Sequence, residues 1–269
     1  MTLPGKTLRR VYTEHDVADA AYSPDGKRIA ISADWTDRDD FDNWDIGVMS
    51  VAGGPVTRLT TGPADEMAPT WSPEGRNIAF SKSRVNEYAS SEIYRIAPQR
   101  GAKATLVAHA PTSSAPNGCT SHGYESPKWH PSKPILLVQD ECSRKNGLEY
   151  QSKLINATTG KVMSALPFYI DGGWSPAGQY LAGVAYNRDR EPIFGRSVVR
   201  ATPAGKVVNK IATPQPSDAF FNTMWSPDGR TVAYTKSSHG VGSIWVASAA
   251  GGTPTRIITG GGVYLHDWR

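Results

Sequence analysis

One short turn motif occurs five times in this sequence, and each copy begins with an aromatic residue. The copies are YSPDG at 22–26, WSPEG at 71–75, WHPSK at 129–133, WSPAG at 174–178 and WSPDG at 225–229. Proline presets φ at about −65°, aspartate accepts hydrogen bonds from the local backbone, and glycine adopts positive φ without a steric penalty. The motif therefore predicts a tight hairpin turn, repeated at intervals of 45 to 58 residues.

Apolar segments follow each turn in a constant order. A strand A ends in the aromatic residue, and a strand B is expected at 28–32, 77–81, 134–139, 180–185 and 231–235. Strands C and D follow, as DIGVMS and VTRLT do in the first unit. Four short strands in each unit of about 40–50 residues are typical of a propeller blade. The sequence predicts an all-β fold, a β-propeller of four-stranded antiparallel blades.

The number of blades depends on the two ends of the sequence. The five units span approximately 17–64, 65–123, 124–168, 169–218 and 219–262 of a single domain, 1–269. Residues 6–16 resemble a strand D, and residues 263–269 resemble a strand A without a turn after it. Strands shared in this way form a split blade. We expect six blades with an incomplete, split last blade, and five blades with surplus ends is the alternative. A fragment of a longer protein is a further interpretation of these ends.

At these repeats the sequence resembles a known family. YSPDGKRIAISAD, WSPEGRNIAFSKS and WSPDGRTVAYTKS, with AGGPVTRLTTG and AGGTPTRIITG, are similar to the TolB-type propeller repeat, a WD-repeat-like motif. The resemblance covers nearly the whole chain. The repeat occurs in the periplasmic protein of the Tol system, in propellers of prolyl oligopeptidase-type peptidases and in oligogalacturonate lyases. The chain has no room for the α/β domain of TolB, and no G-x-S-x-G motif of a hydrolase is present.

Charge and hydropathy exclude several function classes. The chain has 29 Lys and Arg against 25 Asp and Glu, a net charge of +4, and the basic residues are scattered. We therefore expect no nucleic-acid partner. No apolar run is long enough to span a membrane, and the N-terminal residues contain no signal peptide. We expect a monomer.

The strand order places the irregular loops at one end of the blades. The A–B and C–D turns are short and lie together, whereas the B–C and D–A connections are longer and lie at the opposite end. Variable loops on a rigid scaffold commonly carry function. We expect the binding surface on this B–C/D–A face. Its candidate binding residues are Trp35, Asp39, Asp42, Trp44, Tyr88, Glu125, Asp171 and Asn222.

An acidic loop and the mouth of the central channel offer metal ligands. The segment ADWTDRDDFDNWD contains Asp37, Asp39 and Asp42, whose spacing suits calcium, although it does not complete an EF-hand pattern. A solvated acidic loop is the alternative. The residues three before each aromatic include Asp171 and Asn222, and His15 and His266 lie nearby as candidate transition-metal ligands. A divalent cation is therefore the candidate cofactor, and structural histidines are the alternative.

The two cysteines are expected at the same end of one blade. Cys119 precedes the expected strand A of the third unit, and Cys142 follows its strand B. The hairpin between these strands brings the two positions together, which permits a disulfide. A disulfide indicates an oxidising compartment, the periplasm or the exterior. Unpaired thiols in the cytoplasm are the alternative.

Two classes of function follow. The first is a non-catalytic scaffold that binds a protein or peptide on the B–C/D–A face, as the resemblance to TolB-type propellers implies. The second is a metal-assisted, oligogalacturonate lyase-like enzyme with its site in the central funnel. The propeller of a larger prolyl oligopeptidase-type peptidase is a further alternative. Because the chain contains no catalytic motif, we favour the scaffold.

Overall fold

The computed structural model describes residues 14–35, 43–83, 91–110, 119, 121–144, 147–186, 196–260 and 267–268. All regular elements in these ranges are β-strands. The chain forms two compact units, one within Arg10–Ala165 and the other within Leu166–Arg269. The part of the chain described here contains no helix that is long and apolar enough to cross a membrane.

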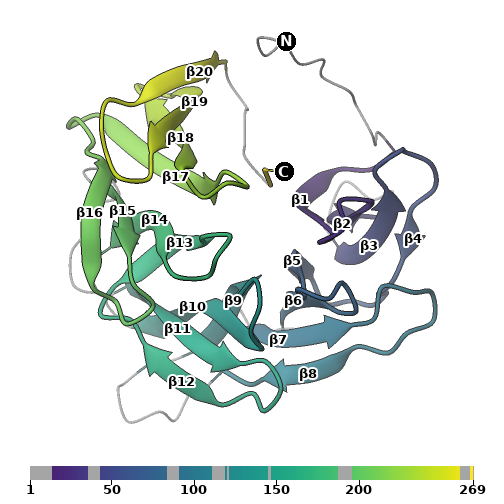
Figure 1. Ribbon diagram of the computed structural model, residues 1–269. Helices are drawn as coiled ribbons and strands as arrows, with labels where there is room; N and C mark the ends of the chain where they lie inside the picture. Colours follow the sequence, from purple (N-terminus) through teal and green to yellow (C-terminus); the bar gives the residue numbers. More distant parts are fainter. Residues whose placement is uncertain are drawn as a thin grey trace. The chain divides into compact units, whose positions relative to one another are not determined.

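The first unit contains three four-stranded antiparallel sheets (Figure 1). Blade 1 consists of β1 (Val17–Tyr22), β2 (Arg28–Asp34), β3 (Trp44–Ser50) and β4 (Thr57–Arg58). Blade 2 consists of β5 (Glu66–Trp71), β6 (Ile78–Ser83), β7 (Ser91–Ile96) and β8 (Thr105–Ala108). Blade 3 consists of β9 (Ser121–Trp129), β10 (Ile135–Arg144), β11 (Gly147–Asn156) and β12 (Val162–Ala165).

The second unit contains two further sheets of the same kind. Blade 4 consists of β13 (Tyr169–Trp174), β14 (Leu181–Tyr186), β15 (Val198–Ala201) and β16 (Val207–Ala212). Blade 5 consists of β17 (Asp218–Trp225), β18 (Thr231–Ser238), β19 (Val241–Ser248) and β20 (Thr255–Thr259). In every blade each strand pairs with its neighbour in sequence, so the predicted meander of four strands is confirmed.

The blade count corrects the leading prediction. The described residues form five sheets, which favours the five-bladed alternative over six blades with a split last blade. Most of the two expected terminal strands, 6–16 and 263–269, lies outside the described residues; residues 14–16 and 267–268, which are described, are not in strands. Short segments that match a strand pattern at chain ends do not establish pairing, because pairing depends on distant partners.

The turn motif forms the predicted hairpin between the first two strands of each blade. In blade 1 the Asp25 carboxylate accepts hydrogen bonds from the Ser23 hydroxyl at 2.5 Å and from the Lys27 backbone N–H at 3.1 Å. Blade 3 has His130 in place of the serine, and its Nδ1 accepts the backbone N–H groups of Ser132 and Lys133, both at 3.1 Å. The turn carboxylates and His130 therefore stabilise the hairpins. We call this end of a blade the turn end and the opposite end the loop end.

Apolar side chains fill the space between neighbouring blades within each unit. Ile46 of blade 1 packs with Ile78 and Phe80 of blade 2, and all three have an exposed fraction of 0%. In the second unit Val198 of blade 4 packs in one cluster with Phe220 of blade 5. Full burial of each such side chain contributes about 1.5–3 kcal/mol. These layers hold adjacent blades together.

Two of the repeated tryptophans also connect blades through hydrogen bonds. The Trp71 indole N–H donates to the backbone carbonyl of Ala21 in blade 1 at 3.0 Å. The Trp225 indole N–H donates to the carbonyl of Gly173 in blade 4 at 3.2 Å. Each acceptor directly precedes the aromatic residue of the previous blade, so the aromatic position of the motif serves both the core and the blade junction.

Candidate functional site

The loop end of blade 5 is built by a tight turn and a short incoming segment. β18 and β19 are joined by His239 and Gly240, whose φ values of 50° and 77° are both positive. A two-residue turn with two positive φ angles matches the twist of antiparallel strands. His239 is exposed at the tip of this turn. The turn thus presents an imidazole beside the start of β17.

A hollow of about 530 Å³ lies at this loop end. Its lining combines apolar groups, two hydroxyls and the exposed imidazole, and consists of Pro216, Ser217, Ala219, Phe221, Ser237, His239 and Gly240. Sites for ligands typically have an apolar lining with a few polar groups that fix orientation. The hollow can therefore accept an apolar side chain and hydrogen-bond the polar atoms next to it.

A buried ion pair fixes the segment that lines the hollow. The Asp218 carboxylate lies 2.8 Å from Lys236 Nζ and accepts the backbone N–H of Gln215 at 2.9 Å. Burial raises the pKa of Asp218, but the hydrogen bonds from Lys236, Gln215 and Ser238 outweigh it and leave the pKa below its usual value. Asp218 is therefore ionised at neutral pH and holds the chain that leads into Pro216.

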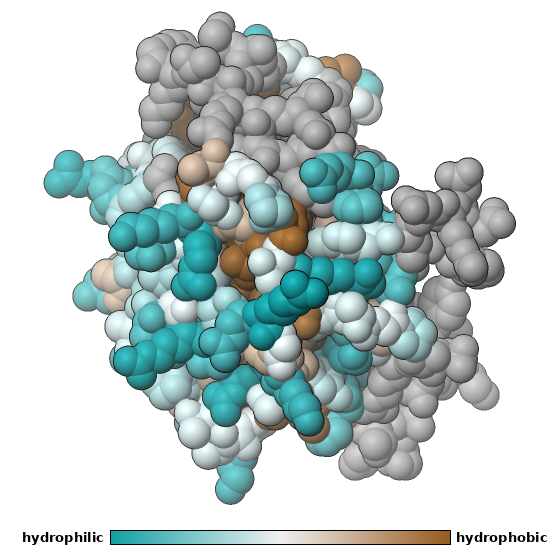
Figure 2. All heavy atoms as spheres, turned by 90° about the vertical axis from the view of Figure 1, so that its right-hand side faces the viewer, coloured by the Kyte–Doolittle hydropathy of each residue, from teal (hydrophilic) through white to brown (hydrophobic). Residues whose placement is uncertain are grey.

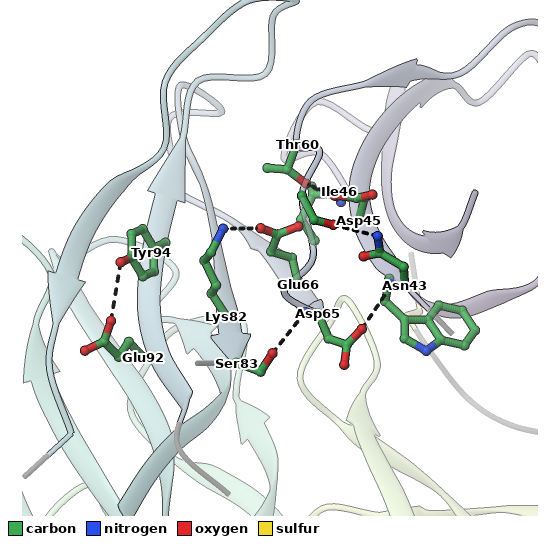
Figure 3. A network of polar contacts seen from close by, with 12 residues as sticks. Asn43, Asp45, Ile46, Thr60, Asp65, Glu66, Lys82, Ser83, Glu92 and Tyr94 are labelled. Atoms are coloured by element: carbon green, nitrogen blue, oxygen red, sulfur yellow. Dashed lines mark hydrogen bonds and ion pairs between the residues drawn. The ribbon is translucent and has the colours of Figure 1, made fainter. Parts of the chain in front are cut away.

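A second cluster of charges lies at the loop end between blades 1 and 2 (Figure 3). Asp45 on β3 pairs with Arg58 on β4, and Glu66 on β5 lies 2.5 Å from Lys82 Nζ on β6. Both carboxylates have an exposed fraction of 0%. The Asp45 carboxylate also accepts the Thr60 hydroxyl at 3.2 Å. Two acids and two bases thus meet inside the blade junction.

The environment of Glu66 favours its protonated form. Burial is the main cause, and the neighbouring Asp45 carboxyl adds to it; against the opposing effect of Lys82, the pKa of Glu66 rises to about 7. Paired carboxyls with a raised pKa can act as acid and base where a substrate reaches them. Because Glu66 and Asp45 are both fully buried, their role here is in the packing of the two blades.

The two predicted tryptophans of the acidic loop lie at the loop end of blade 1. Trp35 is half-buried against Gly47 of β3, the Arg58 guanidinium carbon lies 5.3 Å from its ring centroid, and the His15 ring lies 5.9 Å away. Trp44 begins β3, and its backbone N–H donates to Asp65 Oδ1 at 3.2 Å.

Figure 2 shows hydrophilic side chains crossing a central group of apolar atoms on the side that carries β3 and β4. Charged stems cover apolar surface in this way.

The inner strands β5, β9 and β17 share an unusual backbone conformation. Ala68, Ser126 and Asn222, each three residues before the repeated tryptophan, have φ of 54°, 46° and 49°. The strand pairing shifts at all three, as in a β-bulge. Asp19 Oδ2 of blade 1 accepts the Ala68 N–H at 3.2 Å. This bond ties the Ala68 bulge to the previous blade.

The other predicted site residues are placed as follows. Glu125 on β9 accepts the Ser91 hydroxyl at 3.2 Å, and the carbonyl of Asp171 on β13 accepts the Thr223 hydroxyl at 2.8 Å. The structure brings His15 next to Trp35. The remaining candidates lie outside the described residues; they are Asp37, Asp39, Asp42, Tyr88 and His266.

The two cysteines are joined in a disulfide. Their Cα atoms are 5.5 Å apart, and both residues are buried. Cys142 lies directly opposite His122 in the β9–β10 pair. The bridge attaches Cys119, which precedes β9, to the loop end of blade 3. Loop closure by a disulfide of this span contributes about 3 kcal/mol in the chain-entropy account.

Sequence reasoning missed the residues that line the hollow and the contact between Glu66 and Asp45. The tripeptide Ser238-His239-Gly240 did carry a signal, since Gly at the second turn position is typical of a two-residue hairpin. Glu66 carried no such signal. Its contact with the blade 1 network depends on how β5 packs on β3, which periodicity along one strand does not reveal.

Comparisons with known proteins show likeness in structure. No protein-family model matches the sequence, and no curated protein matches it. A protein assigned as TolB from Agrobacterium tumefaciens is 17% identical, with a TM-score of 0.68 over 97% of this chain and 88% of that chain. TolB from Acinetobacter baumannii is 18% identical, with a TM-score of 0.63 over 92% of this chain and 56% of that one.

An enzyme shares the same architecture. Oligogalacturonate lyase from Vibrio parahaemolyticus is 12% identical, with a TM-score of 0.57 over 92% of this chain and 68% of that chain. Proteins of different activity thus match with similar scores, and at such low identity the likeness establishes the fold alone. The chain has the fold of a TolB-type β-propeller.

Proposed function

We propose that this protein is a non-catalytic binding scaffold that holds a peptide or protein partner at the loop end of blade 5. The observation that carries this proposal is the hollow of about 530 Å³ between β17 and the β18–β19 turn. Phe221 and Ala219 offer an apolar floor, and His239 stands exposed at its edge. A partner would insert an apolar side chain and hydrogen-bond Ser217 or Ser237 with its backbone.

The rigid support of the hollow favours this role. Asp218 is fixed by Lys236 and by the Gln215 N–H, so the segment that forms one wall is ordered before a partner binds. A preformed site avoids the cost of ordering loops on association. The exposed Val241, with an exposed fraction of 53%, extends the apolar surface beyond the turn.

The described residues favour a scaffold over a metal-assisted lyase. Within them, the one group of three or more potential metal ligands is Cys119, His122 and Cys142, and its two sulfurs are bonded to each other. The Asp45 and Glu66 carboxyls of the blade 1–blade 2 junction are closed to solvent. A substrate therefore does not reach these two carboxyls.

The disulfide supports a location in an oxidising compartment, the periplasm or the cell exterior. Disulfides persist there and are rare in the cytoplasm. We expect the partner to be present in the same compartment.

Selection from a peptide display library tests the proposal. The parent protein is used as bait, and enriched peptides are then measured against two variants by fluorescence anisotropy. Ser217→Trp fills the hollow, whereas Ala250→Trp adds the same bulk at the exposed turn end of blade 5. We expect peptides with an apolar anchor that lose at least tenfold in affinity for Ser217→Trp and keep their affinity for Ala250→Trp.

Two outcomes would contradict the proposal. One is the enrichment of no peptide over a bait-free selection. The other is equal affinity of the enriched peptides for the parent and Ser217→Trp, since binding would then lie elsewhere. Circular dichroism of both variants confirms that a loss of affinity does not reflect unfolding.

A further inference from the structure

Three potential metal ligands gather at the loop end of blade 3. Cys119, His122 and Cys142 are all buried, and one ligand atom from each lies within 4.8 Å of the others. His122 and Cys142 are direct cross-strand partners on β9 and β10, which places their side chains on the same face of the sheet. The disulfide brings Cys119 to the same place.

His122 is oriented as a metal-binding histidine is. Its Nδ1 lies 3.2 Å from Asp140 Oδ1, and Asp140 Oδ2 in turn lies 2.7 Å from Lys153 Nζ. A carboxylate on one ring nitrogen fixes the ring and directs the other nitrogen to the metal. Asp140 is two residues from Cys142 on β10, so the sheet itself aligns this chain of contacts.

The second ring nitrogen of His122 has no hydrogen-bond partner among the described atoms. His122 has an exposed fraction of only 4%, and its Nε2 is buried. Buried polar nitrogens are nearly always paired, and an unpaired one requires an explanation. Nε2 is the nitrogen that a metal would bind, because Asp140 already occupies Nδ1.

We propose that reduction of the Cys119–Cys142 disulfide turns this cluster into a Zn²⁺ site with His122 as the third protein ligand. Two thiolates and one imidazole suit Zn²⁺ and leave a fourth position for water. Two thiolates balance the charge of the ion, and Asp140 is balanced by Lys153, so the filled site adds no net charge to the buried region.

The chemistry requires an external two-electron reductant, such as a dithiol. One dithiol transfers two electrons and two protons, the bond between the two cysteine sulfurs breaks, and the reductant becomes a disulfide. Zn²⁺ then displaces the two thiol protons, which are released to solvent. The sulfurs separate to bind the ion at about 2.3 Å each. The bridge and the metal are therefore alternative occupants of the same place.

Zn²⁺ binding by the reduced and the oxidised full-length protein tests the proposal. The protein is reduced with a phosphine, and its affinity for Zn²⁺ is measured by competition with a chromophoric chelator. Co²⁺ serves as a second probe, because thiolate ligands give it a ligand-to-metal absorption band. We expect one equivalent bound by the reduced protein and none by the oxidised protein.

Variants separate this site from binding at other histidines. His122→Gln removes the third ligand, and Asp140→Asn removes the carboxylate behind it. We expect Asp140→Asn to weaken Zn²⁺ binding by about 10- to 100-fold and His122→Gln by at least as much. His109→Gln, which changes an exposed histidine that follows β8, is the matched control and is expected to bind as the parent does.

Several results would overturn the proposal. They are equal Zn²⁺ binding by the oxidised and reduced protein, equal binding by reduced parent and His122→Gln, or unfolding of the reduced protein both with and without Zn²⁺. Circular dichroism follows folding in every sample. The oxidised His122→Gln variant keeps its disulfide, so its melting temperature shows whether the substitution itself damages blade 3.

Discussion

The junction of blades 1 and 2 and the junction of blades 4 and 5 are alike at the turn end and differ at the loop end. In both, a tryptophan indole donates to the previous blade, at 3.0 Å for Trp71 and 3.2 Å for Trp225. In both, a glycine of positive φ, Gly75 or Gly229, faces the turn proline of the previous blade. The motif therefore makes the same contacts at these two junctions.

At the loop end the two junctions shift the pKa of a buried carboxyl in opposite directions. Glu66 lies beside a second carboxyl, and its pKa is raised to about 7. Asp218 has Lys236 and two further donors, and its pKa is lowered. The difference shows that this end of the blades varies independently of the repeat. Beside Asp218 it forms the hollow to which we assign binding.

The largest expected effect tests the shared part of the comparison. Trp71→Ala and Trp225→Ala should each lower the free energy of unfolding by about 3–5 kcal/mol, because each removes a large buried aromatic and a hydrogen bond between blades. Urea unfolding followed by far-ultraviolet circular dichroism measures the change. Parent-like stability of either variant would contradict the equivalence of the two junctions.

Glu66→Gln tests the junction of blades 1 and 2 through the pH dependence of the free energy of unfolding. The folded protein raises the Glu66 pKa from 4.5 to about 7, so it binds more protons than the unfolded chain in this range. Parent stability should therefore fall as pH rises from 4.5 to 7, by up to about 3 kcal/mol. The Glu66→Gln variant should lack this decrease in stability between pH 4.5 and 7.

Denaturant midpoints across this pH range measure the slope. Glu74→Gln, at an exposed turn position of blade 2, is the matched control and should keep the parent slope. An identical slope for parent and Glu66→Gln would show that the buried carboxyl does not retain its proton.

Asp218→Asn, at the junction of blades 4 and 5, tests a contribution to stability with the opposite pH dependence. A lowered pKa stabilises the folded protein above the unfolded value of 3.8, and this contribution disappears as pH falls through the lower, folded value. We expect a loss of about 1–3 kcal/mol at pH 7, since a charged hydrogen-bond acceptor is removed. The loss should shrink in acid, as measured by thermal unfolding. A loss that grows in acid would be incompatible with the ion pair.

The smallest expected effect concerns the turn glycines. Gly75→Ala and Gly229→Ala place a Cβ at φ of 69° and 68°, which should cost about 1 kcal/mol each. The added atom meets the neighbouring proline at ordinary distances of 3.7 and 3.5 Å, so backbone strain is the cause. Calorimetric melting temperatures should shift equally. Clearly unequal shifts would show that the two turns differ in backbone strain.

The part of the fold that the sequence predicted is the part that local chemistry determines. The turn residues of 22–26 and 225–229 act within five residues of one another, and the aromatic before each turn marks the core. The register of one hairpin also placed Cys119 and Cys142 at the same end of blade 3, where the structure joins them.

The site depends on contacts that no local pattern contains. Glu66 and Asp45 meet across two blades, and His122 faces the disulfide only because β9 and β10 pair in one register. Trp35, a predicted binding residue, is half-buried against Gly47 and lies close to the Arg58 guanidinium. Which loop residues face solvent depends on packing between elements, and single-strand periodicity does not carry that information.

Hydrogen-exchange mass spectrometry of the protein with a selected peptide tests the central proposal most directly. Binding at the hollow predicts slowed amide exchange at Ser217–Phe221 and Ser237–Gly240, the two segments that line it. Exchange at 226–230, the turn end of the same blade, should be unchanged. Protection confined to that turn end, or to another blade, would contradict a binding site at the loop end of blade 5.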